Sequence, residues 1–229
     1  MSILTDLKDL LFPRLCLACG TRLHPSEDML CTSCHFKLPH TRLLHTPGNE
    51  IEKLFWGHFP IERASALLYY SRAGEVAHVL AHMKYYGRKD VCLKMGEMMA
   101  DELEGTDFFE GVDCLIPVPL HPERLRKRGY NQSEWLARGI ASRNGIPVCT
   151  DVLYRLRNNQ TQTHKTAFER RTNTEGLFGL TPQSDRLIHR HVMLIDDVLT
   201  TGATLEACGE ALSAIEGIRI SILTLAWTR

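Results

Sequence analysis

The sequence has 229 residues, of which 44% are hydrophobic and 24% are charged, and this composition excludes a disordered or fibrous chain. A chain of this length can bury a core without disulfides, so we expect one substantial domain with a small appendage. The 27 lysines and arginines equal the 27 aspartates and glutamates, which excludes a whole-molecule field that would attract nucleic acid or a membrane.

Local charge departs from this neutral balance. Residues 122–171 contain eleven lysines or arginines and four aspartates or glutamates, a surplus of seven positive charges. We therefore expect this middle third of the chain to face an anionic ligand. The first 16 residues lack the basic head, long apolar run and small-residue cleavage site of a signal peptide. No stretch approaches the roughly 18 apolar residues of a membrane span, so we expect a cytoplasmic protein without membrane insertion.

Four of the eight cysteines form two close pairs near the start of the chain, with the spacing C-x2-C-x11-C-x2-C. They are Cys16, Cys19, Cys31 and Cys34. Two such pairs, separated by a short hairpin, deliver four thiolates to one tetrahedral ion, and Gly20 permits a tight turn beside it. Disulfides or unbound thiols are the alternative, which a cytosolic environment disfavours. We predict a structural zinc knuckle, in which protein ligands fill every position around the metal.

The rest of the chain alternates between apolar runs and segments whose apolar residues have helical spacing. We expect strands at 63–70, 112–119, 147–150, 192–197 and 218–226, and helices at 75–85, 91–103, 131–143 and 204–215. The continuously apolar run at 112–119 suits a strand buried on both faces of a parallel sheet. The alternation predicts an α/β fold with an open, mostly parallel sheet and helices on both faces. The four scattered cysteines, Cys92, Cys114, Cys149 and Cys208, are expected in the core.

The segment VMLIDDVLTTGAT, from Val192 to Thr204, carries the most specific signal for function. In it a buried strand leads through a loop into a helix, and ligands of open α/β sheets bind where strands end. Loop N–H groups, threonine hydroxyls and the helix N-terminus together form a cradle for phosphate, and Gly202 permits close backbone approach. Asp196 and Asp197 can accept hydrogen bonds from sugar hydroxyls and favour a nearby Mg²⁺.

This segment resembles the phosphoribosyl-pyrophosphate signature of type I phosphoribosyltransferases, in which hydrophobic residues precede a paired acid and V-x-T-T-G-x-T. The resemblance implies a type I phosphoribosyltransferase-like sheet, with Asp196 and Asp197 on the ribose hydroxyls and with Mg²⁺ accompanying phosphoribosyl pyrophosphate. It places the 5-phosphate on the loop residues Thr200, Thr201, Gly202, Ala203 and Thr204.

The same family rests the pyrophosphate on a loop after the first core strand, which corresponds here to Pro117, Val118 and Pro119. Four basic residues follow within LHPERLRKRGYNQ and supply charge for a diphosphate or phosphodiester, although a solvated basic loop is the alternative. They are Arg124, Arg126, Lys127 and Arg128. Segment 157–173 is polar and basic, as in the mobile loop that closes over substrate in such enzymes. Its candidate contacts are Gln162, Lys165, Arg170 and Arg171.

The whole set of motifs resembles the ComF family of competence proteins. The motifs are the four-cysteine knuckle, MKYYGR, PVPL, R-x-R-G-Y-N-Q, the stretch from Thr163 to Asn173, and DDVLTTGAT. They divide the chain into a zinc-binding knuckle at 1–45 and a phosphoribosyltransferase-like domain at 46–229. The resemblance implies a role in the uptake and handling of transforming single-stranded DNA, with DNA-uptake or helicase proteins as partners.

Three uses of a phosphoribosyl site remain open. An active phosphoribosyltransferase would orient the diphosphate as leaving group while a base or amine attacks the anomeric carbon. Asp196, Asp197 and Arg126 would then be its catalytic residues. A regulatory protein would instead only sense the metabolite.

A DNA-binding protein is the third possibility. Its basic surplus and phosphate cradle would hold a single strand, and aromatic side chains would stack the bases. The candidates for stacking are Tyr85, Tyr86, Tyr130 and Trp135, of which Trp135 also has the spacing of a core residue.

Overall fold

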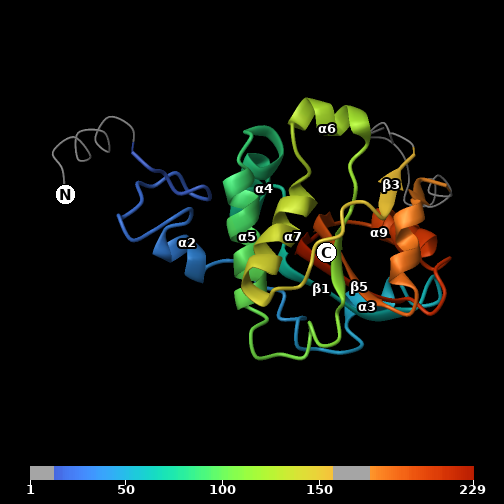
Figure 1. The fold of residues 1–229 in the computed structure, drawn as a ribbon. Coiled ribbons are helices and arrows are strands. Elements are labelled where there is room, and N and C mark those ends of the chain that lie inside the picture. Colours follow the sequence, from blue (N-terminus) through green and yellow to red (C-terminus); the bar gives the residue numbers. More distant parts are fainter. Residues whose placement is uncertain (1–12, 157–175) are drawn as a thin grey trace.

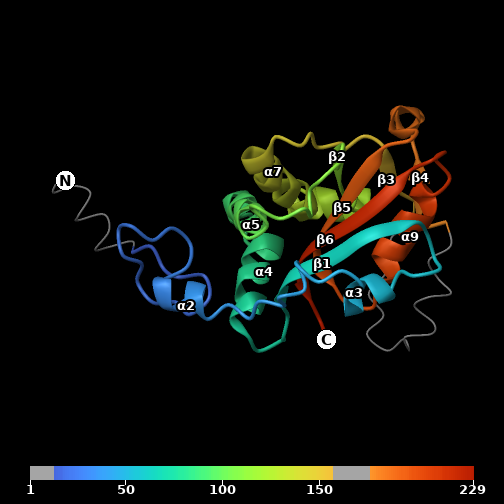
Figure 2. The same ribbon diagram turned by 90° about the horizontal axis from the view of Figure 1, so that it is seen from below.

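The computed structural model describes residues 13–156 and 176–229. At its centre lies a four-stranded sheet in the order β1-β6-β5-β2, in which all neighbouring strands are parallel (Figures 1 and 2). These strands are β1 (Ile61–Tyr69), β2 (Cys114–Pro117), β5 (His191–Leu199) and β6 (Arg219–Trp227). The parallel sheet predicted from the apolar runs is therefore confirmed.

Helices cover both faces of this sheet, as Figure 2 shows. They are α3 (Glu50–Lys53), α4 (Glu75–Tyr85), α5 (Lys89–Asp101), α7 (Gln132–Asn144) and α9 (Ala203–Leu212). Successive side chains of β5 point to opposite faces, which is the ordinary geometry of a strand. Met193 and Ile195 therefore join the hydrophobic cluster beneath α4, α5 and α7. Val192 and Leu194 join the cluster beneath α3 and α9.

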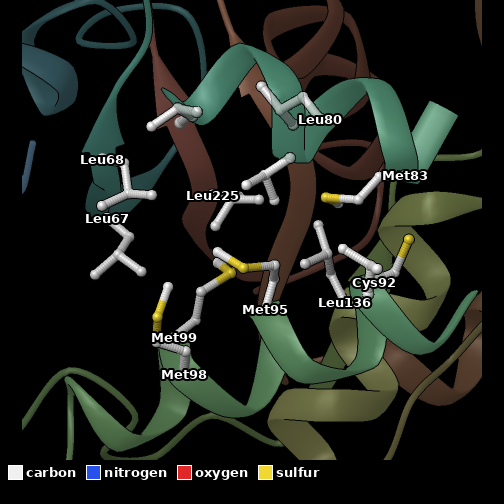
Figure 3. Packing of buried hydrophobic residues seen from close by; sticks show 14 of the residues in the cluster. Leu67, Leu68, Leu80, Met83, Cys92, Met95, Met98, Met99, Leu136 and Leu225 are labelled. Atoms are coloured by element: carbon white, nitrogen blue, oxygen red, sulfur yellow. The ribbon is translucent and has the colours of Figure 1, made fainter. Parts of the chain in front are cut away.

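Helices α5 and α7 pack closely because a glycine of each helix faces the other. A Cβ atom added to Gly96 would lie 2.1 Å from the carbonyl oxygen of Leu136. One added to Gly139 would lie 2.1 Å from the carbonyl oxygen of Leu93. Figure 3 shows the apolar side chains that fill the space between these helices, α4 and the sheet, among them Met83, Met95, Met99, Leu136 and Leu225.

Three segments differ from the sequence prediction. The expected strand at 147–150 is a single bridge, in which Val148 pairs in parallel with Leu115. The stretch expected as a basic loop contains helix α6 (Pro122–Arg128), which ends at the left-handed Gly129. No predicted strand covers the antiparallel pair formed by β3 (Leu153–Arg155) and β4 (Phe178–Leu180).

The scattered cysteines and the N-terminal region complete the fold. Cys92, Cys114 and Cys208 are buried as predicted, whereas Cys149 is partly exposed because it follows the bridge at the edge of the sheet. The cysteine-rich region contains the short helix α2 (Thr32–Phe36). None of the helices within 13–156 and 176–229 is long and apolar enough to cross a membrane.

The chain passes from the cysteine-rich region directly onto the sheet. The backbone N–H of Thr41 donates to the carbonyl of Leu67, and that of Tyr69 donates to the carbonyl of Pro39, at 2.9 and 2.7 Å. Residues 39–41 therefore lie along β1. The division of the chain at residues 45 and 46 stays a prediction.

Candidate functional site

The DDVLTTGAT loop lies where strand β5 ends and helix α9 begins. Gly202 adopts the left-handed conformation, with φ of 84°, which glycine reaches without steric strain. Among the described residues, no side chain caps the start of α9. The first N–H groups of that helix, which have no partner within the helix itself, therefore face the loop as donors for an anion.

Two carboxylates lie near the end of β5, the second of them two residues before the strand ends at Leu199 and the loop begins. Asp196 Oδ1 accepts hydrogen bonds from the Ser133 hydroxyl and from the backbone N–H of Asp197, both at 2.9 Å. Asp197 is buried, and its Oδ2 accepts a hydrogen bond from Gln132 Nε2 at 3.0 Å. The same oxygen lies 3.2 Å from the ammonium nitrogen of Lys84. The acids are thus held by three side chains from elsewhere in the sequence.

The two acids have different electrostatic surroundings. Burial, followed by the neighbouring charge of Asp197, raises the pKa of Asp196 to about 7. Asp197 carries the ion pair with Lys84, so the positive charge is placed on one acid of the pair.

The start of helix α7 supplies the hydrogen bonds to both acids. Asn131 caps this helix by accepting from the Ser133 N–H at 3.1 Å, and its amide donates to the carbonyl of Val118 at 2.9 Å. Gln132 and Ser133 follow directly and reach the acid pair. The sequence motif R-x-R-G-Y-N-Q contained Gln132, but the motif alone gave this residue no role.

The predicted pyrophosphate loop adjoins the acid pair. Pro117 ends β2 opposite Ile195 of β5, and the N–H of Val118 donates to the carbonyl of Ile195 at 2.9 Å. Pro119 follows as the chain leaves the sheet for α6 (Figure 1). The backbone of this loop therefore begins beside the residue that precedes Asp196.

The basic residues assigned to this loop are placed differently. Arg126, Lys127 and Arg128 form the last turn of α6, which Figure 1 shows projecting away from the sheet. Within the described part of the chain, no ion pair joins Arg126 or Arg128 to the acid pair. The Arg128 guanidinium instead lies 5.9 Å from the centre of the Tyr85 ring.

One of the four aromatic residues proposed for base stacking is not available for it. Tyr130 is buried, and its hydroxyl donates to the carbonyl of Met83 at 2.6 Å, so its role is structural. Trp135 is partly buried, with the Lys89 ammonium 5.5 Å from its ring centre. Tyr85 and Tyr86 are 75% and 66% exposed and stay candidates. The remaining proposed contacts, Gln162, Lys165, Arg170 and Arg171, lie outside the described residues.

The four cysteines of the predicted knuckle converge on one point. Their sulfur atoms all lie within 4.8 Å of one another. The backbone N–H of Cys31 donates to Cys16 Sγ at 3.3 Å, and that of Cys34 donates to Cys31 Sγ at 3.5 Å. Four sulfurs in this arrangement fit a tetrahedral metal ion, and the N–H donors would stabilise thiolates.

No family model matches the chain. The chain is 25% identical to competence protein F of Haemophilus influenzae, over 92% of this chain and 96% of that protein. It is 28% identical to DNA utilization protein YhgH of Salmonella typhimurium, over 86% of this chain and 77% of that protein. Competence protein ComFC of Bacillus subtilis is 37% identical over a shorter stretch, 43% of this chain and 37% of that protein.

Solved phosphoribosyltransferase structures also match the chain. Adenine phosphoribosyltransferase from Thermoanaerobacter pseudethanolicus aligns with 67% of this chain and 75% of that one, at 20% identity and a TM-score of 0.38. The assignment of the fold rests on the parallel sheet described above. The chain is thus similar over most of its length to competence protein F and to DNA utilization protein YhgH, and it combines a parallel α/β sheet with a four-cysteine cluster near its N-terminus.

Proposed function

We propose that this protein binds phosphoribosyl pyrophosphate with Mg²⁺ at the end of strand β5, and that it acts in the handling of single-stranded DNA. The observation that carries the first part is the position of the acid pair. Asp196 and Asp197 stand near the end of β5, two strand residues before a glycine-containing loop that leads to a helix N-terminus without a side-chain cap. Groups that accept from ribose hydroxyls therefore lie close to groups that donate to a phosphate, as a ribose 5-phosphate requires.

Each part of the ligand has a matching group in this site. The ribose hydroxyls would donate to Asp196 and Asp197, and the 5-phosphate would accept from the N–H groups and hydroxyls of residues 200–204. The diphosphate would lie along residues 117–119, which begin beside β5. Mg²⁺ prefers oxygen ligands and is commonly held by one or two carboxylates together with substrate phosphates, so this donor set fits it.

The second proposed metal is zinc at the four-cysteine cluster. Sulfur ligands in a tetrahedral set favour zinc, and four protein ligands leave no open position for substrate. The metal would therefore fold the knuckle and take no part in chemistry at the acid pair.

The role in DNA handling is supported by the relatives and by local charge. The names of two of these relatives refer to competence and to DNA utilization. Helix α6 presents Arg126, Lys127 and Arg128, and the exposed Tyr85 ring lies beneath Arg128. Basic groups beside an exposed aromatic ring suit a single strand, whose phosphates and bases they contact. DNA-uptake or helicase proteins would be the partners in such a role.

An active phosphoribosyltransferase is the alternative use of the same site. The acid pair would orient the ribose and stabilise charge that develops at the anomeric carbon, while an acceptor base or amine attacks it. The Arg126 guanidinium would have to approach the diphosphate from the end of α6. Release of pyrophosphate in the presence of a panel of nucleobases and amines would establish this alternative.

Calorimetry with phosphoribosyl pyrophosphate and Mg²⁺ tests the binding proposal. We expect saturable binding by the wild-type protein and loss of at least tenfold in affinity in the double variant Asp196→Ala, Asp197→Ala. Unchanged affinity in that variant would remove the acid pair from the site.

A parallel titration with single-stranded DNA tests the second role. Affinity for DNA should fall steeply as salt rises, because bound phosphates release counterions. Binding that is insensitive to salt would contradict a role for the α6 basic residues.

A further inference from the structure

We infer that Lys84 is a positioning residue of the phosphoribosyl site, which holds the side chain of Asp197 in place to accept a ribose hydroxyl; this inference rests on the proposed function. Lys84 lies in the last turn of α4, within MKYYGR. Its Nζ lies 3.2 Å from Asp197 Oδ2. Arg155 also interacts electrostatically with the acid pair, through Asp196, whereas Lys84 contacts Asp197 itself.

The burial of Asp197 keeps its contact with Lys84 from being screened as a surface ion pair is. Asp197 is 8% exposed, and the neighbouring Asp196 adds a second carboxyl group to the same place. A buried carboxylate that loses its counter-charge is costly to keep in place, because desolvation is expensive. Gln132 also contacts Oδ2 at 3.0 Å, but its amide is neutral. Lys84 therefore supplies the positive charge beside Asp197, and Gln132 adds a directional hydrogen bond to the same carboxylate oxygen.

Lys84 and Gln132 reach Asp197 from two segments that are fixed to each other. The Tyr130 hydroxyl donates to the carbonyl of Met83, the residue before Lys84, at 2.6 Å. Tyr130 stands two residues before Gln132, just ahead of helix α7. The end of α4 and the start of α7 are thus joined by a buried hydrogen bond, and each contributes a side chain that contacts the carboxylate.

Three variants test this role by calorimetry with phosphoribosyl pyrophosphate and Mg²⁺. Lys84→Met keeps the length of the side chain without its charge and should weaken binding at least tenfold. Lys84→Arg restores the charge and should bring affinity back to within about threefold of wild type. Lys94→Met is the matched control, because the exposed Lys94 pairs with Asp28 and Glu97 and with neither acid of the site, so its loss should change affinity less than twofold.

Thermal melting, read by circular dichroism, separates positioning from folding. Loss of affinity in Lys84→Met with rescue in Lys84→Arg, at similar melting temperatures, supports the inference. If Lys84→Met does not fold, Lys84→Gln takes its place with the same expected loss. Equal affinity in Lys84→Met, Lys94→Met and wild type overturns the role of Lys84 while the proposed function stands. Absence of binding by the wild-type protein overturns both.

Discussion

The crossing of helices α5 and α7 gives a direct test of the fold that positions the site. In Gly139→Ala, the new methyl group would lie 2.1 Å from the carbonyl oxygen of Leu93 and 2.9 Å from the backbone nitrogen of Glu97. These are backbone atoms, so no side-chain rotation relieves the contact, and the helices must separate by roughly 1 Å to reach normal packing distances. Because α7 also presents Gln132 and Ser133 to the acid pair, this separation reaches the site.

Two effects of opposite sign determine the magnitude. Alanine improves helix propensity by about 1 kcal/mol over glycine. Overpacking of a filled core costs about 1–3 kcal/mol, and contact with backbone places this site at the upper end. We expect a net loss of about 2 kcal/mol, which corresponds to a fall of about 4–8 °C in melting temperature for a chain of this size.

Thermal and urea unfolding followed by circular dichroism measure this loss. Arg138→Ala serves as the control, since Arg138 is exposed on the same helix. Its loss removes an ion pair with Glu134, worth about 0.3–0.5 kcal/mol, and a contact with the Trp135 ring at 5.8 Å, worth about 0.5–1 kcal/mol, so it should cost less than Gly139→Ala. A Gly139→Ala protein as stable as wild type, or more stable, would refute the close backbone approach of these helices.

Three further predictions concern the site and the knuckle. The pKa of Asp196 is raised in the folded protein to about 7. The contribution of Asp196 to the free energy of unfolding is therefore full below about pH 4 and is lost as pH rises through 7. Asp196→Asn should flatten this loss of stability in urea titrations from about pH 5 to 8. Gly202→Ala should cost about 1 kcal/mol through strain at positive φ and weaken ligand binding, which melting and calorimetry would detect; a neutral result would contradict a fixed loop. Cys34→Ser should abolish stoichiometric zinc in elemental analysis and lower the melting temperature. Cys149→Ser, which lies outside the cluster, should keep the metal. Zinc retained in Cys34→Ser would contradict the four-sulfur site.

The elements that could be predicted from the sequence are those with a strong periodic signal. The helix expected at 75–85 has those bounds in the structure, because its buried residues Val76, Val79, Leu80 and Met83 lie on one helical face. Helix α6 buries none of its side chains, so PERLRKR offered no apolar face to recognise. Strands β3 and β4 have three residues each, which is too short for an alternation to stand out.

The site was predictable in part for a similar reason. Its acids and loop are contiguous, so VMLIDDVLTTGAT could be read as one unit with a strand, a turn and a helix start. Lys84, Gln132 and Ser133 reach the acids only through the tertiary fold, and nothing in their local sequence shows which carboxylate they contact. The buried role of Tyr130 was missed because its partner is a backbone carbonyl of another helix.

A crystal structure of the protein with phosphoribosyl pyrophosphate and Mg²⁺ would test the central claim most directly. The account predicts the 5-phosphate on residues 200–204 and the ribose hydroxyls within hydrogen-bond distance of Asp196 and Asp197. A ligand bound elsewhere, or an empty loop in crystals grown at concentrations that saturate binding in solution, would contradict it.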